Sequence, residues 1–292
     1  MNWLLYGILG VISAGASYAF AKGGMHKSSS NLAAALRGTF LFLSALFMVK
    51  ETGTDMALTQ IGQTNLIYLL ASGVATGALW ICLLRALQLG EIIKVVPILE
   101  GSVILNILVG VFFFHDGVSF NTIMILTVLI AGVIMMGLKG VGRGGRRGSW
   151  LGYAAGAMAL TTVTSILERV GISGIHSNYE RLVRYGVALV VVWGVAFSTS
   201  GYRGLRMMSF LDGVYLCLSG VCMGGFWYCM HQAYVLGVNE NVAFVERFDL
   251  VAAVVLGCVF MRERMTIRSV LGMIFMMLGF WLLLADLPII PL

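Results

Sequence analysis

The chain consists of long apolar runs separated by short segments of Gly, Ser, Asn or charged residues. Each run approaches the roughly 20 apolar residues that a helix needs to cross hydrocarbon about 30 Å thick. In the first half, the pattern predicts helices at 3–21, 32–49, 64–84, 92–114 and 120–138. In the second half, it predicts helices at 150–168, 182–199, 211–235, 240–261 and 268–286. We therefore predict an all-α integral membrane protein with ten transmembrane helices.

The two sets of five predicted helices are related in sequence. When the chain is shifted by 147 residues, the halves align almost without gaps, and identical residues coincide at this one offset. The coinciding pairs include Asn31 with Asn178, Arg37 with Arg184, Tyr68 with Tyr215, Gly73 with Gly220 and Trp80 with Trp227. The domains predicted from this repeat are 1–138 and 150–292, joined by a Gly- and Arg-rich linker at 139–149.

The odd number of helices in each repeat predicts how the repeats are oriented. After five crossings the chain lies on the opposite side of the membrane, so the second copy enters from that side. Inverted repeats related by an axis in the membrane plane are typical of secondary transporters, whose binding site lies between the repeats. We therefore expect a carrier and not an enzyme.

Composition excludes several other classes of protein. With 59% hydrophobic and 11% charged residues, the chain is too apolar to cover the surface of a soluble domain. Its net charge of +6 comes from Lys and Arg in short loops, where they determine topology, so we expect no nucleic-acid partner. The sequence has no metal-ligand spacing and no phosphate-binding loop, and we expect neither a metal nor another cofactor. The cysteines all fall inside apolar runs and are interpreted as packing residues: Cys82, Cys217, Cys222, Cys229 and Cys258.

Two segments resemble a known family. The first runs from Trp80 to Gly90 and continues through Val95-Val-Pro-Ile98 and the helix that contains Gly110. The second contains Trp227, Ala233, Gly237, the turn Met261-Arg-Glu-Arg264 and Gly279. Both resemble the EamA-type repeat of the drug/metabolite transporter superfamily. The resemblance implies ten helices, alternating access and a central cavity lined mainly by helices 1, 3, 4, 6, 8 and 9. We accordingly expect a multi-pass protein in the inner (cytoplasmic) membrane of a prokaryote, present as a monomer or weak homodimer in contact with lipid.

Charged residues inside the bilayer are the first candidates for a transport path, because each costs about 3 kcal/mol on insertion scales. The fourth predicted helix carries Glu100 three residues after Pro97, and the ninth carries Glu246, Arg247 and Asp249. Glu100 corresponds to Arg247 under the repeat, so we expect an acid and a base to face each other across a central cavity. The alternative is that the three residues of the ninth helix pair only with one another or with Arg184 and serve packing.

Aromatic residues form a second group of candidates. Trp80 and Trp227 occupy matching places near the ends of the third and eighth helices, with Tyr228 and His231 beside the second. They belong either to the aromatic belt at the membrane surface or to a cavity wall that attracts a flat or cationic substrate. His231 could carry a proton or only pack. Tyr18 offers a hydroxyl on the first helix, to the substrate or to its own backbone.

Basic residues near the helix ends predict the orientation. Arg37 and Arg184 begin the second and seventh helices, and we expect both to extend to the lipid headgroups. Most other basic residues lie beside odd-numbered loops: Lys22, Lys27, Arg85, Lys94, Lys139, Arg143, Arg146, Arg147, Arg203, Arg206, Arg262, Arg264 and Arg268. The positive-inside rule then predicts that both termini lie outside the cytoplasm.

The functional expectation is a secondary transporter, by preference an exporter, of a small amphipathic metabolite that resembles an amino acid. A zwitterion suits the mixed charges, since its amine can meet an acid and its carboxylate can meet Arg247. One of Glu246 and Asp249 could bind and release protons while the other stays ionised, so proton coupling and simple facilitated diffusion are both open. Alternative substrates are cationic drugs, quaternary amines and nucleobase-like metabolites. Alternatives from another class are a membrane-embedded lipid-handling protein and a non-transporting receptor.

Overall fold

The fold was analysed in a computed structural model that describes residues 2–54, 62–115, 117–137, 149–171, 176–199, 204 and 206–285. Regular structure in these residues is entirely helical. The helices of the first half are α1 (Trp3–Gly23), α2 (Ser30–Thr52), α3 (Gln63–Leu89), α4 (Ile92–Glu100), α5 (Ser102–Phe113) and α6 (Phe120–Gly137). Those of the second half are α7 (Ser149–Gly171), α8 (Ser177–Thr199), α10 (Phe210–Leu236), α11 (Asn239–Glu246), α12 (Asp249–Met261) and α13 (Ile267–Ala285). Of the linker predicted at 139–149, only Ser149 lies within the described residues.

Most of these helices are long and apolar enough to cross a bilayer. Among the described residues, nine helical segments of at least 18 residues meet that condition, with α4 and α5 counted together as one span. Large apolar side chains on their outer surfaces are exposed, including Phe113, Phe120, Phe210 and Ile267 at 76–84%. Such surfaces are stable in lipid and not in water. The chain is an integral, multi-pass, all-α membrane protein.

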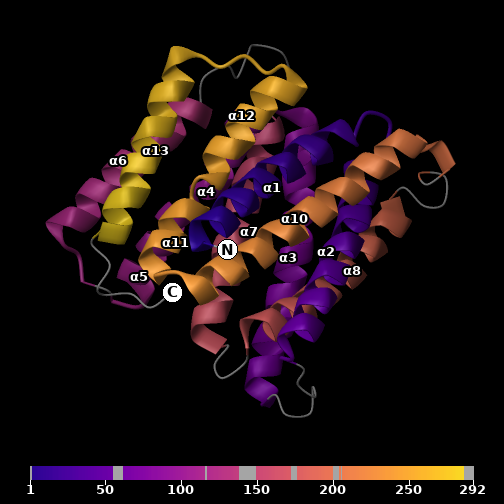
Figure 1. The fold of residues 1–292 in the computed structure, drawn as a ribbon, viewed down its shortest axis with the longest axis horizontal. Helices are drawn as coiled ribbons and strands as arrows, with labels where there is room; N and C mark the ends of the chain where they lie inside the picture. The colour runs from indigo at the N-terminus through magenta and orange to yellow at the C-terminus, as the bar shows by residue number, and fades with distance from the viewer. Residues whose placement is uncertain are drawn as a thin grey trace.

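The helices pack in pairs that join the two halves of the chain. α1 lies along α10, and α3 lies along α7. α2 packs against α8, and α6 packs against α13. These last two pairs occupy opposite edges of the molecule in Figure 1, with α1, α10, α3 and α7 between them. The segments α4–α5 and α11–α12 lie near the middle of this arrangement, where α12 contacts both α4 and α1.

Two of the expected spans are interrupted. The predicted helix at 92–114 becomes α4 and α5, because the N–H of Gly101 also bonds to the carbonyl of Ile98, three residues back, at 3.1 Å, and the N–H of Ile104 bonds to the carbonyl of Gly101, again three residues back, at 3.0 Å. The predicted helix at 240–261 becomes α11 and α12, because Arg247 and Phe248 donate to carbonyls only three residues back, at 3.2 and 3.0 Å. Such tighter turns end the regular α-helical ladder. α11 and α12 are each too short to span a membrane alone, so this segment is absent from the nine apolar spans found among the described residues.

The helix bounds recur along the chain. Adding 147 to the bounds of α2 gives those of α8, and adding it to the bounds of α3 gives those of α10. α1 and α6 come within about one residue of α7 and α13 under the same shift. The interruptions recur too, because Gly101 moves onto Phe248.

Candidate functional site

The helix interruptions place charged residues at the centre of the bundle. Glu100 is the last residue of α4, Arg247 follows the last residue of α11, and Asp249 begins α12. Backbone groups at helix ends lack their regular intrahelical partners, and here Gly101, Arg247 and Phe248 donate to carbonyls three residues back instead. Irregular backbone at this depth is tolerated where it is buried in protein or lines a cavity. Both features suit a binding site.

Glu100 and Arg247 face each other. Nη1 of Arg247 lies 3.6 Å from Oε2 of Glu100, and their side chains are 29% and 13% exposed. The Arg247 guanidinium also lies 5.5 Å from the ring centre of Phe280 on α13. The acid and the base therefore meet as an ion pair that is largely shielded, although Arg247 keeps part of its surface accessible.

Two further carboxylates lie close to Arg247 along the chain and interact with it at longer range than Glu100 does. Glu246 and Asp249 both interact with it electrostatically, as does Glu100. The Tyr234 hydroxyl donates a 2.7 Å hydrogen bond to Oε2 of Glu246. Asp249 accepts a 2.6 Å bond at Oδ1 from the N–H of Leu250. Because three acids share one arginine, this cluster has spare capacity for a cation or a proton.

Tyr18 joins this cluster to a second buried charge. Its side chain is 5% exposed, and its hydroxyl interacts electrostatically with Asp249 and Glu100 and also with Arg37. Arg37 is only 3% exposed and donates from Nη2 to the hydroxyl of Ser17 at 3.2 Å. The expectation that Arg37 extends to the headgroups is therefore wrong, because α1 and α10 cover it.

Arg184 does not extend to the headgroups either. Its side chain is 13% exposed and forms ion pairs with Glu168 on α7 and with Glu180 one turn earlier on α8. The neighbouring Arg169 lies with its guanidinium 4.2 Å from the ring centre of Phe114. Carboxylates within reach thus hold Arg184 inside the bundle.

The expected aromatic wall is divided among separate contacts. Trp80 is 7% exposed and packs edge to face against Tyr185 of α8, with ring centres 5.1 Å apart. The ring of Trp227 has the Arg181 guanidinium 4.1 Å above it.

The other two aromatic candidates on α10 have partners of their own. Tyr228 lies in a groove between α2 and α10, where its ring centre is 6.1 Å from that of Phe47. The ring centre of His231 lies 6.4 Å from that of His176. The structure thus does not bring these aromatic side chains together around the Glu100–Arg247 pair.

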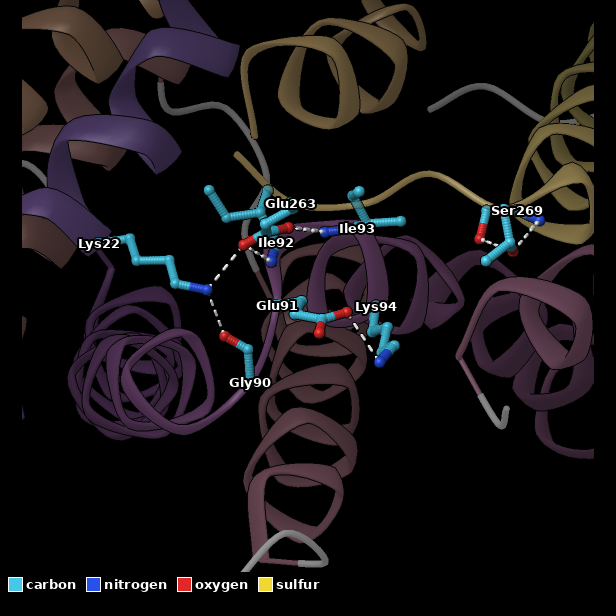
Figure 2. A network of polar contacts seen from close by, with 9 residues as sticks. Lys22, Gly90, Glu91, Ile92, Ile93, Lys94, Glu263 and Ser269 are labelled. Atoms are coloured by element: carbon cyan, nitrogen blue, oxygen red, sulfur yellow. Dashed lines mark hydrogen bonds and ion pairs between the residues drawn. The ribbon is translucent and has the colours of Figure 1, made fainter. Parts of the chain in front are cut away.

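A polar junction at one end of the bundle holds α4 in place (Figure 2). Glu263, between α12 and α13, is 6% exposed and pairs with Lys22 of α1 at 2.7 Å. Its two oxygens also accept the N–H groups of Ile92 and Ile93 at 2.9 and 3.0 Å. A carboxylate at a helix N-terminus satisfies free donors and complements the helix dipole. Lys22 in turn donates to the carbonyl of Gly90 at 2.6 Å.

Several contacts of the site could not be predicted from the sequence. The sequence places Lys22 and Glu263 beside loops, and no local pattern predicts that they meet across 241 positions. Tyr234 lies 12 residues from Glu246, and its role depends on the turn between α10 and α11. For metals, the described residues contain no group of three or more His, Cys, Asp or Glu that could hold an ion.

The chain is similar to known membrane transporters. Residues 1–138 match the EamA-like transporter family. A protein of Sinorhizobium sp, named as an uncharacterised transporter in the cobO 3′ region, is 27% identical over 135 residues. That match covers 46% of this chain and 96% of the relative.

Proposed function

Residues 1–138 belong to the EamA-like transporter family, and from this premise we propose that the protein is a secondary carrier of a small amphipathic metabolite that resembles an amino acid. The family and the transporter-named relative make the protein a membrane transporter in general. The observation that carries the finer proposal is the shielded Glu100–Arg247 pair, with Glu246 and Asp249 beside it, at two helix interruptions. Intramembrane charges of this kind mark substrate and ion paths.

The proposed mechanism is alternating access between two inverted five-helix repeats. Helix bounds that recur at an offset of 147 residues support it, as does the reciprocal packing of α1 on α10 and α3 on α7. Counting α11 and α12 as one interrupted span gives the ten crossings that an inverted pair requires. Interrupted helices at a repeat interface are where secondary transporters bind substrate and coupling ion.

The proposed substrate is a zwitterion. Glu100, Glu246 and Asp249 outnumber Arg247, so the amine of a substrate has a carboxylate available to it. Charge-assisted hydrogen bonds of this kind are about twice as strong as neutral ones. The surplus carboxylate also offers a place for a proton, and we propose export coupled to proton movement in the opposite direction.

Flux through proteoliposomes tests the proposal. Wild-type protein should carry labelled L-amino acids from a mixed metabolite panel. The flux should be faster when a gradient drives protons across the membrane in the opposite direction. Asp249→Asn and Glu246→Gln should abolish the flux or remove its dependence on the gradient, and Arg247→Ala should abolish it. Glu240→Gln is the matched control, because Glu240 lies exposed in the first turn of the same helix α11. Wild-type flux in all three variants would remove these residues from the mechanism.

The panel also separates the alternatives. Flux of quaternary amines or nucleobases without flux of amino acids would keep the carrier and replace the substrate. Scrambling of labelled lipid by the same vesicles would indicate a lipid-handling protein. Ligand binding without flux of any panel member would indicate a receptor.

A further inference from the structure

Within the described parts of the chain, Arg37 is a buried cation without a counter-ion. Only 3% of its surface is exposed, yet no carboxylate lies within 4.0 Å of it among the residues that the structure describes. To the described residues, its side chain makes one hydrogen bond, from Nη2 to the neutral hydroxyl of Ser17 at 3.2 Å. Its Nε is buried and has no hydrogen-bond partner in the described part of the chain. A buried charge that is neither paired nor fully hydrogen-bonded is costly, so its retention needs a reason.

The other half of the chain shows how this position can be neutralised. Arg184, 147 residues further on, has ion pairs with Glu168 and Glu180. The positions that correspond to these two acids in the first half are Ala21 and Ala33, both 0% exposed. The first half therefore keeps the arginine and lacks both of its counter-ions. The free charge is a local difference between two otherwise matching sites.

Arg37 lies near the acidic cluster but is separate from it. Helix α1 connects them, because it contacts α12 and its Ser17 accepts the hydrogen bond of Arg37, and the hydroxyl of Tyr18 on the same helix interacts electrostatically with Arg37 as well as with Asp249 and Glu100. Arg247 already has Glu100 at 3.6 Å and two more acids around it. Of the two arginines near Tyr18, Arg37 is thus the one whose charge is unmatched.

We propose that Arg37, and not Arg247, binds the anionic group of the substrate, while Asp249 and Glu100 receive its cationic group on the other side of Tyr18. This inference rests on the proposed function for its substrate class. It assigns the two ends of a zwitterion to α2 and to the junction of α4 with α12, with α1 between them. Arg247 then holds the acids in position.

Thermal unfolding of the full chain in detergent tests the assignment with three probes. L-Phenylalanine carries both charges, L-phenylalaninamide lacks the carboxylate, and 3-phenylpropionate lacks the amine. In wild-type protein, L-phenylalanine should raise the unfolding temperature at concentrations roughly tenfold or more below that of its amide, as expected for loss of one charge-assisted interaction, and this difference is the preference for a carboxylate. 3-Phenylpropionate loses the amine contact instead, so it should also need higher concentrations than L-phenylalanine.

Three variants locate the anion site. Arg37→Gln should lose the preference for carboxylates, so that L-phenylalanine acts no better than its amide. Arg37→Lys keeps the charge and should keep a reduced preference, which guards against a fold that needs a cation here. Arg184→Gln, at the matching and neutralised position, should keep the full preference even where it lowers the unfolding temperature.

The outcomes separate this inference from the proposed function. A folded Arg37→Gln that still prefers carboxylates, or a wild-type protein that does not discriminate, overturns the role of Arg37. Preference for carboxylates in wild type and its loss in Arg37→Gln, together with absent L-phenylalanine flux, would uphold the anion site and reject the amino-acid carrier. If Arg37→Gln does not fold, Arg37→Lys still tests the proposal. A carboxylate preference in Arg37→Lys that equals the preference of wild type and of Arg184→Gln would overturn a direct contact with the guanidinium.

Discussion

At the scale of single residues, Gly15 marks a close approach of α1 to α12. A Cβ at this position would lie 2.6 Å from the carbonyl carbon of Ala252, which is backbone and cannot rotate away. Contacts of this kind are typical of membrane helices, which pack through small residues.

We predict that Gly15→Val separates α1 from α12 and lowers the free energy of unfolding by about 3 kcal/mol, the upper range for overpacking. Flux should fall with it, because Tyr18 and Asp249 lie on these two helices. The measurement is thermal unfolding together with proteoliposome flux. Gly152→Ala on α7 is the control, because a Cβ there meets no atom within 4 Å; equal behaviour of the two variants would contradict the prediction.

The sequence indicated the charged residues of the candidate site but not their partners. Glu100 and Arg247 were chosen because charge is rare inside apolar runs, and the repeat related their positions. Burial of Arg37 could not be read from its helix, because the covering residues come from α1 and α10. The repeat related Trp80 to Trp227, and Tyr228 and His231 lie beside Trp227 in the sequence, but neither relation says which neighbouring helix a ring contacts.

At the scale of helices, the sequence predicted where apolar spans occur better than where they break. The lengths of the apolar runs were enough to locate the long helices, because the thickness of the hydrocarbon layer sets how long a membrane-spanning helix must be. The interruption at Arg247 and Phe248 lies in a segment without Pro or Gly, where apolar composition alone does not reveal a turn. Its repeat counterpart at Gly101 carries the clearer signal.

At this scale, the contacts of Glu263 predict how its removal affects stability. Removing one member of a buried ion pair costs about 3–5 kcal/mol, because the other charge stays buried. Glu263→Ala should therefore destabilise the protein by about 3 kcal/mol and loosen the start of α4, where Ile92 and Ile93 lose their acceptor. Denaturation in detergent and hydrogen exchange of the α4 amides measure the two effects.

The nearby pair of Glu91 and Lys94 provides the comparison. Their charged atoms are also 2.7 Å apart, but Glu91 is 47% exposed. Exposed pairs contribute about 0.2–1 kcal/mol, so Glu91→Ala should change stability by less than about 1 kcal/mol. Similar losses in Glu91→Ala and Glu263→Ala would mean that burial does not decide the strength of the junction.

At the scale of the whole molecule, the distribution of basic residues predicts orientation. Lys22, Lys94, Arg264 and Arg268 gather around the junction of Figure 2 and the cavity of about 530 Å³ beside it. Arg169 and Arg181 flank an even-numbered loop and reduce the contrast between the two ends. Because the loops with more positive charge stay in the cytoplasm, we predict that both termini lie outside it.

Paired reporters measure this orientation. A C-terminal fluorescent protein that matures only in the cytoplasm should stay dark, and a C-terminal phosphatase that needs an oxidising compartment should be active. The same reporters inserted into the linker at 139–149 should show the reverse pattern. A fluorescent C-terminus would place both ends in the cytoplasm and contradict the prediction.

The two anchors of α4 have a mechanical consequence. This helix has nine residues and is about 13 Å long. Glu263 accepts hydrogen bonds from the first turn of this helix, and Arg247 forms an ion pair with its last residue, Glu100. Both contacts come from one stretch of chain that begins at the end of α11 and runs past α12. Because both ends of α4 contact this one stretch of chain, we expect α4 to move together with it, so that a displacement of the α12–α13 connection would also displace Glu100 and Arg247.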